Sequence, residues 1–596
     1  MIVRTPAAMR KGFALLALLL LAANGMPAQA QRADNGGNGV FATQVRSAKR
    51  PHLTVVVSID QFRADYLRRL TDLFLPAESG GKVGGFRYLM TAGSYFVDAR
   101  YGHYPLFTGP GHAVILTGAY PYKTGIISND WWDKAAQSPV YCVDDPRQKV
   151  VGAVTGSKAT PMGPKNLRST TVGDELKLAT NGAARVITIS LKDRAAILLG
   201  GHTQDMSLWF DDSTGRWISS TAYCKDGKLP AWVEEVNAEA LPDKALGMTW
   251  TPSVSSEALS RAILPNLSPD RNPYGLGLRF PHTIGKERNP TNYKAFTRTP
   301  FANAYVFETA KRAVRAEKLG QRGDTPDLLA LNLATNDYIG HAFGPYSPEA
   351  LDVTVQTDRQ LSDFLNFLQA TIPGGLREVV FVVTADHGVV PIPEDLRAVG
   401  IDAGRVPETS PDDAVQKALT AAFGEAAWVG KDASGKTVGG YVEPYLYLNE
   451  AAIAQALANG KATSRAQIEE AAARALAALP GIYACYTRTQ IMEGRLPAND
   501  IARHIYNGFY PKLSGDVVAV NEQLYIVNES GPYTTTHGTP YAYDTHVPIL
   551  IAGPGIRPGV WPDPVSPADI APTLCALLGV ELPSGCDGVI LKAALR

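Results

Sequence analysis

Uninterrupted apolar runs recur along the chain, and polar residues able to do chemistry stand beside them. The first run, at residues 53–59, is rich in β-branched residues and ends at Asp60. Further runs lie at 185–190 before Lys192, at 327–333 before Asp337, at 379–384 before Asp386, and at 547–551 after His537. An apolar run without alternation is typical of a strand that is buried on both faces.

Amphipathic helical patterns separate these runs, for example at 302–319, 348–370 and 465–479. Strands that alternate with helices predict an α/β fold, with a central, mostly parallel sheet and helices on both faces. Sites in such sheets form at the carboxyl ends of the strands. Asp60, Asp337 and Asp386 each follow a predicted strand, so we expect them to meet at one edge of the sheet.

Two stretches interrupt this pattern and predict inserted lid or cap regions. Residues from about 203 to 300 are rich in Trp, Pro, Asn and Ser and have weak periodicity. Residues from about 392 to 525 contain an Ala-rich helical segment and short strand-like runs. We expect one catalytic domain over residues 51–596 that contains both insertions.

The N-terminal residues 1–30 have the pattern of a secretory signal peptide. A basic start is followed by an apolar stretch at 13–23, which is too short to span a membrane, and by the small-residue cleavage pattern Ala28-Gln29-Ala30. Residues 31–50 are polar and Gly/Asn-rich, as in a linker. An uncleaved anchor is the alternative. The pattern predicts a periplasmic or secreted protein without a membrane anchor after cleavage.

Charge and cysteine content narrow the classes of partner and metal site. The chain has 57 Lys+Arg and 57 Asp+Glu residues, which gives no support for a nucleic-acid partner. None of its five cysteines forms a CxxC motif, which disfavours thiolate zinc sites. Cys575 and Cys586 are close in sequence and are the predicted disulfide pair in an oxidising compartment. The odd count leaves at least one cysteine outside any such pair.

Three aspartates, three histidines and one threonine form a ligand set for two metal ions. They are Asp60, Thr108, Asp337, His341, Asp386, His387 and His537. Aspartate and histidine without cysteine suit zinc, with manganese or iron as alternatives. Each of these residues alone has a simpler interpretation, as a helix cap or a structural histidine. We expect Gly388 to permit the sharp turn that would let the adjacent Asp386 and His387 reach one metal.

Thr108 precedes a helical pattern and is the predicted nucleophile. A free hydroxyl is a poor nucleophile, but a coordinated divalent metal lowers the pKa of an oxygen by many units. The glycines in Gly109-Pro110-Gly111 let backbone N–H groups approach an anion at the start of the helix. The alternative is that Thr108 only caps this helix.

Formal charge favours a phosphate monoester as the substrate. Three aspartates and a Thr108 alkoxide carry four negative charges, which two divalent metals cancel. Lys192 and Arg194, which point the same way if the backbone is extended, then add two positive charges that match a monoester dianion. Asn129 is a further candidate donor to a phosphoryl oxygen, with a turn residue as the alternative.

Seven short motifs resemble the alkaline phosphatase superfamily, in the branch of type I phosphodiesterases and nucleotide pyrophosphatases. Among its members, the chain is most similar to bacterial secreted alkaline phosphatases with a threonine nucleophile. The motifs are Val57–Gln61, Thr108–His112, Ser128–Asp130, Lys192–Arg194, Asn336–His341, Thr384–Gly388 and His537–Tyr541.

The resemblance implies two zinc ions and a role for each site residue. One ion would be held by Asp337, His341 and His537. The other would be held by Asp60, Asp386 and His387, with Thr108 bridging to the phosphoryl group. Asn129, Lys192 and Arg194 would bind phosphate oxygens. His546 is a rival to His537, but the motif favours His537 and leaves Asp544 and His546 structural.

We therefore predict a phosphatase that hydrolyses small phosphate monoesters through a phosphothreonine. The phosphodiesterase relatives lack the Lys-x-Arg pair, which agrees with the charge count. A phosphodiesterase or nucleotide pyrophosphatase with the same metals is the nearest alternative. An exported protein that binds metal or phosphate without catalysis is the other. The sequence indicates no oligomeric state.

Overall fold

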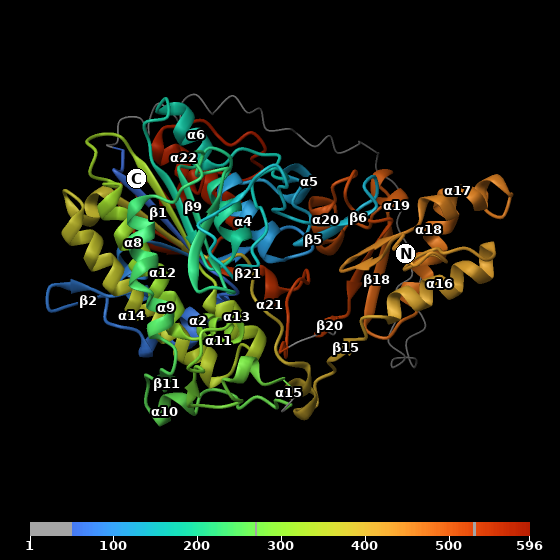
Figure 1. Ribbon diagram of the computed structural model, residues 1–596, viewed down its shortest axis with the longest axis horizontal. Helices are drawn as coiled ribbons and strands as arrows, with labels where there is room; N and C mark the ends of the chain where they lie inside the picture. The colour runs from blue at the N-terminus through green and yellow to red at the C-terminus, as the bar shows by residue number, and fades with distance from the viewer. Residues whose placement is uncertain (1–49, 269–270, 528–531) are drawn as a thin grey trace, which may run out of the picture.

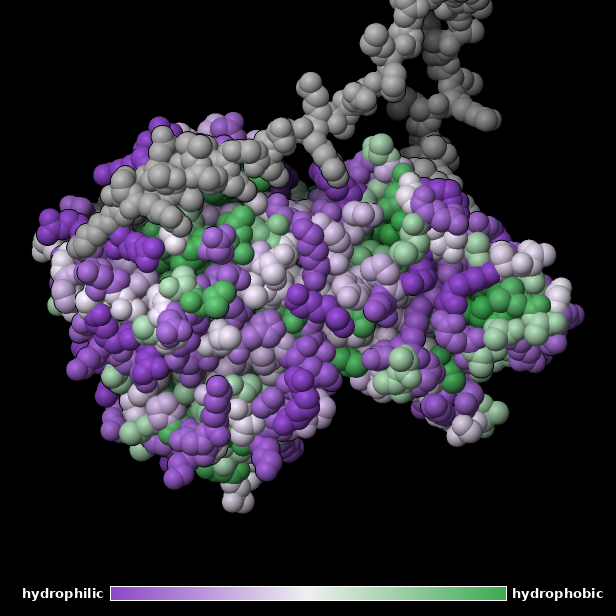
Figure 2. All heavy atoms as spheres, turned by 90° about the horizontal axis from the view of Figure 1, so that it is seen from above, coloured by the Kyte–Doolittle hydropathy of each residue, from purple (hydrophilic) through white to green (hydrophobic). Residues whose placement is uncertain are grey.

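The computed structural model describes residues 50–268, 271–527 and 532–596 (Figure 1). The predicted signal peptide 1–30 and nearly all of the predicted linker 31–50 lie outside the described residues. Among the helices of these three ranges, none has the length and apolar character needed to cross a membrane. Hydrophilic and hydrophobic residues are interspersed over the face seen from above (Figure 2).

A ten-stranded sheet forms the centre of the molecule. Its strand order is β22-β4-β21-β14-β1-β13-β8-β9-β10-β7. The bounds are β22 (Gly559–Trp561), β4 (Ser94–Arg100), β21 (His546–Ala552), β14 (Val379–Thr384), β1 (Leu53–Ile59), β13 (Asp327–Leu333), β8 (Val186–Ser190), β9 (Met206–Asp211), β10 (Arg216–Ser220) and β7 (Val150–Val151). The five strands from β14 to β9 are parallel, whereas β21 and β10 run antiparallel to their neighbours. The predicted α/β sheet is confirmed, with antiparallel strands toward its edges.

The central strands are mostly apolar on both faces, and helices cover both faces of the sheet. Every residue of β1 is buried, and successive side chains enter opposite layers. Val55 and Val57 pack in the layer that holds α12 (Pro300–Ala316) and α14 (Pro348–Thr371). Val56 packs in the other layer, to which α4, α6 and α22 contribute; their bounds are α4 (Thr108–Thr117), α6 (Val172–Ala179) and α22 (Ile570–Leu578).

The two predicted insertions differ in structure. Within residues 392–525, a separate four-stranded sheet forms in the order β16-β17-β19-β18, in the orange part of the ribbon (Figure 1). Its strands are β16 (Gly440–Val442), β17 (Tyr445–Tyr447), β19 (Val517–Asn521) and β18 (Ile482–Thr487), and α16 (Ser410–Phe423) and α18 (Arg465–Ala477) pack against it. In the stretch 203–300, by contrast, β9 and β10 belong to the central sheet, so any insertion there begins after β10.

The predicted disulfide between Cys575 and Cys586 is absent, and all five cysteines are free. Cys575 is fully buried in the apolar layer under α22. Cys586 lies beside Gly118, where a Cβ added to the glycine would come within 2.6 Å of the Cys586 Sγ. Proximity in sequence did not bring the two thiols into bonding geometry.

Candidate active site

The predicted site residues converge on one edge of the central sheet. Asp60 follows β1, Asp386 follows β14, and Asp337 lies on α13 (Thr335–Phe343) just after β13. These strands are parallel, so their carboxyl ends share an edge. His537 precedes β21, which is antiparallel to β14, and so the amino end of β21 reaches the same edge. Strand direction explains why the histidine comes before its strand while the aspartates follow theirs.

A first cluster consists of Asp337, His341 and His537, whose possible ligand atoms all lie within 4.8 Å of one another. Asp337 and His341 are one helical turn apart on α13, and Nε2 of His341 is 3.2 Å from Oδ1 of Asp337. Nε2 of His537 is 3.7 Å from the same oxygen. All three residues are buried.

A second cluster surrounds Asp60, Asp386 and His387, all fully buried. Nε2 of His387 lies 3.0 Å from Oδ2 of Asp386 and 3.5 Å from Oδ1 of Asp60. The His387 and His537 rings stack with centroids 3.5 Å apart, which places the two clusters side by side. The structure therefore brings all six predicted Asp and His ligands together.

The donors of both clusters fit bound cations. Nδ1 of each predicted ligand histidine faces a backbone carbonyl, at Thr535 for His341, at Leu106 for His537 and at Gly388 for His387. Such a contact leaves Nε2 directed into the site, as in metal-binding histidines. Among the described residues, the buried Oδ1 of Asp60 and Oδ2 of Asp386 have no hydrogen bond of good geometry, although the His387 and His112 rings lie near the second oxygen. Buried carboxylate oxygens without donors are costly, and a divalent cation would satisfy them.

The charged groups of the two clusters shift one another's pKa values. Burial, followed by repulsion from Asp386, raises the pKa of Asp60 to about 6. Burial alone would lower the pKa of His387, but Asp386 and Asp60 raise it to about 9. Burial favours a higher pKa for Asp337 as well, yet Lys192 and His341 hold that pKa well below its ordinary value. Lys192 therefore favours the ionised form of Asp337, whereas at Asp60 burial and repulsion from Asp386 outweigh the same lysine.

Thr108 is the first residue of α4 and lies between the clusters and a lysine. Its Oγ1 is 3.4 Å from Nε2 of His387 and 3.4 Å from Nζ of Lys192. The capping position belongs to Phe107, and within the described part of the chain no side chain makes a capping hydrogen bond to this helix. The alternative role of Thr108, as a cap, therefore fails.

The glycines after Thr108 do not form the expected anion cradle. The N–H of Gly109 donates to Oδ1 of Asn129 at 2.8 Å, and that of Gly111 donates to the carbonyl of Phe107 at 2.9 Å. Gly111 is needed for another reason, because a Cβ there would lie 2.4 Å from the carbonyl oxygen of Asp386. Its lack of a side chain lets α4 approach the loop that carries Asp386 and His387.

Gly388 also acts through close approach. A Cβ on Gly388 would lie 2.1 Å from the carbonyl oxygen of Tyr543, whereas its φ is not in the left-handed region. The chain bends at Asp386, and what Gly388 contributes is room for this close approach rather than a left-handed φ. Asp386 and His387 converge because the loop after β14 is pressed against the segment that precedes β21.

Lys192 joins the two clusters electrostatically. Its Nζ lies 2.6 Å from Oδ2 of Asp337 and 3.0 Å from Oδ2 of Asp60. Arg194 is not on an extended segment as expected, because α7 (Asp193–Gly200) begins directly after Lys192. Both residues nevertheless line one cavity of about 290 Å³, together with Tyr141 and Tyr338.

Asn129 presents a donor at the base of the hairpin formed by β5 (Asp130–Asp133) and β6 (Ser138–Tyr141). Its Oδ1 accepts the Gly109 N–H, so the amide is oriented beside the start of α4. The Nδ2 group carries both side-chain hydrogens and remains for another acceptor. The contact ties the hairpin to the start of α4.

Two residues that the sequence analysis did not single out support the ligands. Nδ1 of His112, one turn after Thr108, lies 3.2 Å from Oδ2 of Asp386, and its Nε2 faces Nδ2 of Asn332 at 2.9 Å. Gln61 donates its N–H to Asp386 and its side-chain amide to Asp337. It does so at φ +62°, a conformation unusual for a residue other than glycine. The i,i+4 spacing from Thr108 is the sequence signal for His112.

Asp544 and His546 lie outside both clusters. Oδ2 of Asp544 accepts hydrogen bonds from the backbone and hydroxyl of Thr539. Nε2 of His546 lies 2.8 Å from the carbonyl oxygen of Val97, across β4. The structure thus brings His537, and not His546, to the ligand set.

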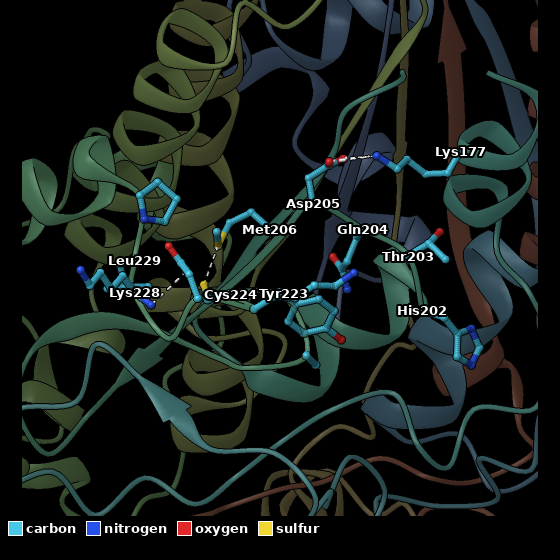
Figure 3. Close-up of a pocket in the computed structure, with 14 residues that line it drawn as sticks. Lys177, His202, Thr203, Gln204, Asp205, Met206, Tyr223, Cys224, Lys228 and Leu229 are labelled. Carbon is cyan, nitrogen blue, oxygen red and sulfur yellow. Dashed lines mark hydrogen bonds and ion pairs between the residues drawn. The ribbon is translucent and has the colours of Figure 1, made fainter. Parts of the chain in front are cut away.

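A large cavity of about 680 Å³ lies away from these residues, at the amino ends of β8 and β9 (Figure 3). Lys177 is paired there with Asp205 at 2.9 Å, and Sγ of Cys224 lies 3.9 Å from Sδ of Met206. It contains none of the predicted site residues. Cavity size alone would therefore place the site at the wrong edge of the sheet.

Comparison with known proteins defines the class. The model of the type I phosphodiesterase / nucleotide pyrophosphatase family matches residues 54–540. The chain belongs to this family, within the alkaline phosphatase superfamily.

The similar proteins narrow the class to alkaline phosphatases. The chain is 35% identical over 565 residues to alkaline phosphatase PhoV of Synechococcus elongatus, covering 92% of this chain and 94% of that protein. It is 31% identical to alkaline phosphatase PafA of Elizabethkingia meningoseptica, covering 92% and 95%. The crystal structure of wild-type PafA matches with a TM-score of 0.79 at 30% identity, covering 92% and 99%. The chain is thus a hydrolase of the metal-dependent, alkaline phosphatase type.

Proposed function

We propose that the chain is an exported alkaline phosphatase that hydrolyses small phosphate monoesters to inorganic phosphate through a phosphothreonine at Thr108. The observation that carries this proposal is the position of the Thr108 hydroxyl. It does not cap α4, and it lies 3.4 Å from both Nε2 of His387 and Nζ of Lys192. The similarity to alkaline phosphatases supports the reaction class. Export rests on the predicted signal peptide, and N-terminal sequencing of the mature protein tests it.

Two zinc ions are the proposed metals. Asp337, His341 and His537 would hold one, and Asp60, Asp386 and His387 would hold the other together with Thr108. A ligand set of carboxylates and imidazoles without thiolates suits zinc. When bound, such cations lower the pKa of a nearby hydroxyl and offset the negative charge that develops during phosphoryl transfer.

The residues of the chain then divide the chemistry among them. The backbone of α4 fixes Thr108, so its Oγ1 attacks phosphorus from a defined direction. The bond from Oγ1 to phosphorus forms as the bond to the leaving alcohol breaks, and water later releases phosphate from the phosphothreonine. Lys192, Arg194 and Asn129 supply donors to the phosphoryl oxygens throughout.

A variant of PafA supports this assignment of donors. Its solved structure, which matches with a TM-score of 0.81 at 29% identity, carries substitutions at a threonine, an asparagine, a lysine and an arginine. The four proposed residues follow the same order here, as Thr108, Asn129, Lys192 and Arg194. The lysine and the arginine are separated by one residue in both chains.

A phosphate-release assay on aryl monoesters and diesters, with metal analysis of the same sample, tests the proposal. We expect monoesters to be turned over at least about a hundredfold faster, because two positive charges match a dianion better than a monoanion. A chelator should abolish turnover and zinc should restore it. A preference for diesters would favour the phosphodiesterase alternative, which the family description includes. Bound metal without any turnover would indicate a binding protein.

Substitution of Asn129 tests the third donor. We expect Asn129→Ala to lower kcat/KM for monoesters about tenfold, the usual effect of removing one hydrogen bond to a charged group. Asn129→Asp should cost more, because it keeps the acceptor for Gly109 but places a negative charge near the phosphoryl group. Steady-state kinetics on both variants measures the difference. Equal kcat/KM for the wild type and the alanine variant would contradict the role.

A further inference from the structure

The guanidinium of Arg194 is held by a tyrosine from a different segment of the chain. Nη1 of Arg194 donates to the hydroxyl oxygen of Tyr141 at 3.1 Å. Nε of Arg194 is buried and has no hydrogen-bond partner among the described residues. The tyrosine therefore restrains the guanidinium while a donor of the same group stays available for an anionic acceptor.

Tyr141 is itself fixed from two sides. Its hydroxyl donates to Oδ1 of Asp193, and the same carboxylate oxygen accepts the backbone N–H of Arg194 at 2.6 Å. Its backbone pairs with Asp130 across the β5–β6 hairpin, and Nδ2 of Asn166 donates to its carbonyl oxygen at 3.4 Å. These contacts hold the Tyr141 hydroxyl in a fixed position beside the first turn of α7.

The hairpin connects this contact to the nucleophile. Asn129 directly precedes β5, and its carbonyl accepts the N–H of Cys142, the residue after Tyr141, at 2.8 Å. Oδ1 of Asn129 in turn accepts the Gly109 N–H beside Thr108. A single hairpin therefore orients two of the proposed phosphate donors, Asn129 through its own side chain and Arg194 through Tyr141.

We propose that Tyr141 is a positioning residue that holds the Arg194 guanidinium in the orientation needed to bind a phosphate monoester. This inference rests on the proposed function, in which Arg194 binds phosphoryl oxygens. A free arginine side chain has many rotamers, and ordering it only when substrate binds lowers affinity for the transition state. A fixed guanidinium avoids that loss, which is the purpose of supporting contacts around a site.

The test is a double-mutant cycle with Tyr141→Phe and Arg194→Ala. We expect Tyr141→Phe to lower kcat/KM for an aryl phosphate monoester about tenfold, as for loss of one hydrogen bond to a charged group, and to weaken inhibition by inorganic phosphate about as much. In the Arg194→Ala background the same substitution should change kcat/KM less than about twofold, because the group it positions is gone. Tyr447→Phe is the matched control. It also removes a buried tyrosine hydroxyl, one that donates to the Leu513 carbonyl.

Asp193→Asn provides a second variant that retains an oxygen acceptor. It should weaken the hold on Tyr141 and lower monoester turnover in the same direction, again only when Arg194 is present. An equal loss from Tyr141→Phe in both backgrounds, or no loss in either, would overturn the inference while leaving the phosphatase assignment intact. No effect of Arg194→Ala alone on monoesters would instead contradict the proposed function, and Tyr141 would then have no phosphate-binding group to position.

Discussion

Thr108→Ala is expected to reduce turnover of phosphate monoesters by at least about a thousandfold. The substitution removes the hydroxyl that lies 3.4 Å from both His387 Nε2 and Lys192 Nζ, together with the γ-methyl group. Water would have to attack phosphorus directly, without the fixed position that α4 gives Oγ1. Steady-state kinetics measures the loss, and metal analysis of the same sample shows whether the clusters still load.

Two variants make this result specific to a nucleophile. Thr108→Ser keeps the hydroxyl and should retain turnover within about tenfold, with a phosphoserine trapped in place of the phosphothreonine. Thr117→Ala removes a buried hydroxyl from the same helix, where Oγ1 donates to the Ala113 carbonyl, and should leave turnover nearly unchanged. A Thr108→Ala enzyme with wild-type turnover and full metal content would refute the phosphothreonine.

Replacing Lys192 and Arg194 by alanine together is expected to separate monoesters from diesters. Turnover of monoesters should fall about a thousandfold and that of diesters about tenfold, because a dianion loses two charge partners and a monoanion needs only one. In the wild type, Lys192 lies 2.6 Å from Asp337 and 3.0 Å from Asp60, so metal content must be measured as well. The ratio of kcat/KM for monoesters to kcat/KM for diesters, compared between the wild type and the variant, decides whether the two charges select monoesters.

The chain offers a matched control at the opposite edge of the sheet. Lys177 and Arg185 both pair with Asp205 at 2.9 Å, so their double alanine variant removes the same charge without touching the site. This control should change both activities by less than about twofold. Equal losses on monoesters and diesters in the Lys192 and Arg194 variant would remove the charge-matching argument.

The strands and the clustered Asp and His residues were predictable because local pattern determines them. The run at 53–59 coincides with β1, and those at 327–333 and 379–384 coincide with β13 and β14. A strand buried on both faces is mostly apolar, so its extent and the polar residue that follows it are visible in the sequence. The helix predicted at 348–370 likewise matches α14 within one residue.

Contacts between distant segments were not predictable from such patterns. Gly111 and Gly388 are needed because a Cβ would collide with a carbonyl oxygen, that of Asp386 at Gly111 and that of Tyr543 at Gly388. These oxygens belong to segments that are distant in sequence and come close only in the folded protein. The expected anion cradle does not form because Asn129 accepts the Gly109 N–H. The expected Cys575–Cys586 disulfide is absent, although the two thiols interact electrostatically. The residue types in the sequence indicate which side chains a site contains, whereas the folded backbone determines which of those side chains are in contact.

By itself the sequence determined the α/β class, the ligand types of the two clusters and the residues proposed to act on phosphate. Each of these follows from the side-chain chemistry of one position and the periodicity around it. Only the tertiary structure decided that Thr108 begins its helix uncapped, that His112 and Gln61 support the carboxylates, and that Tyr141 reaches Arg194. The side-chain contacts join segments that are far apart in sequence, and the packing of α4, α7 and the β5–β6 hairpin around the central sheet sets their distances.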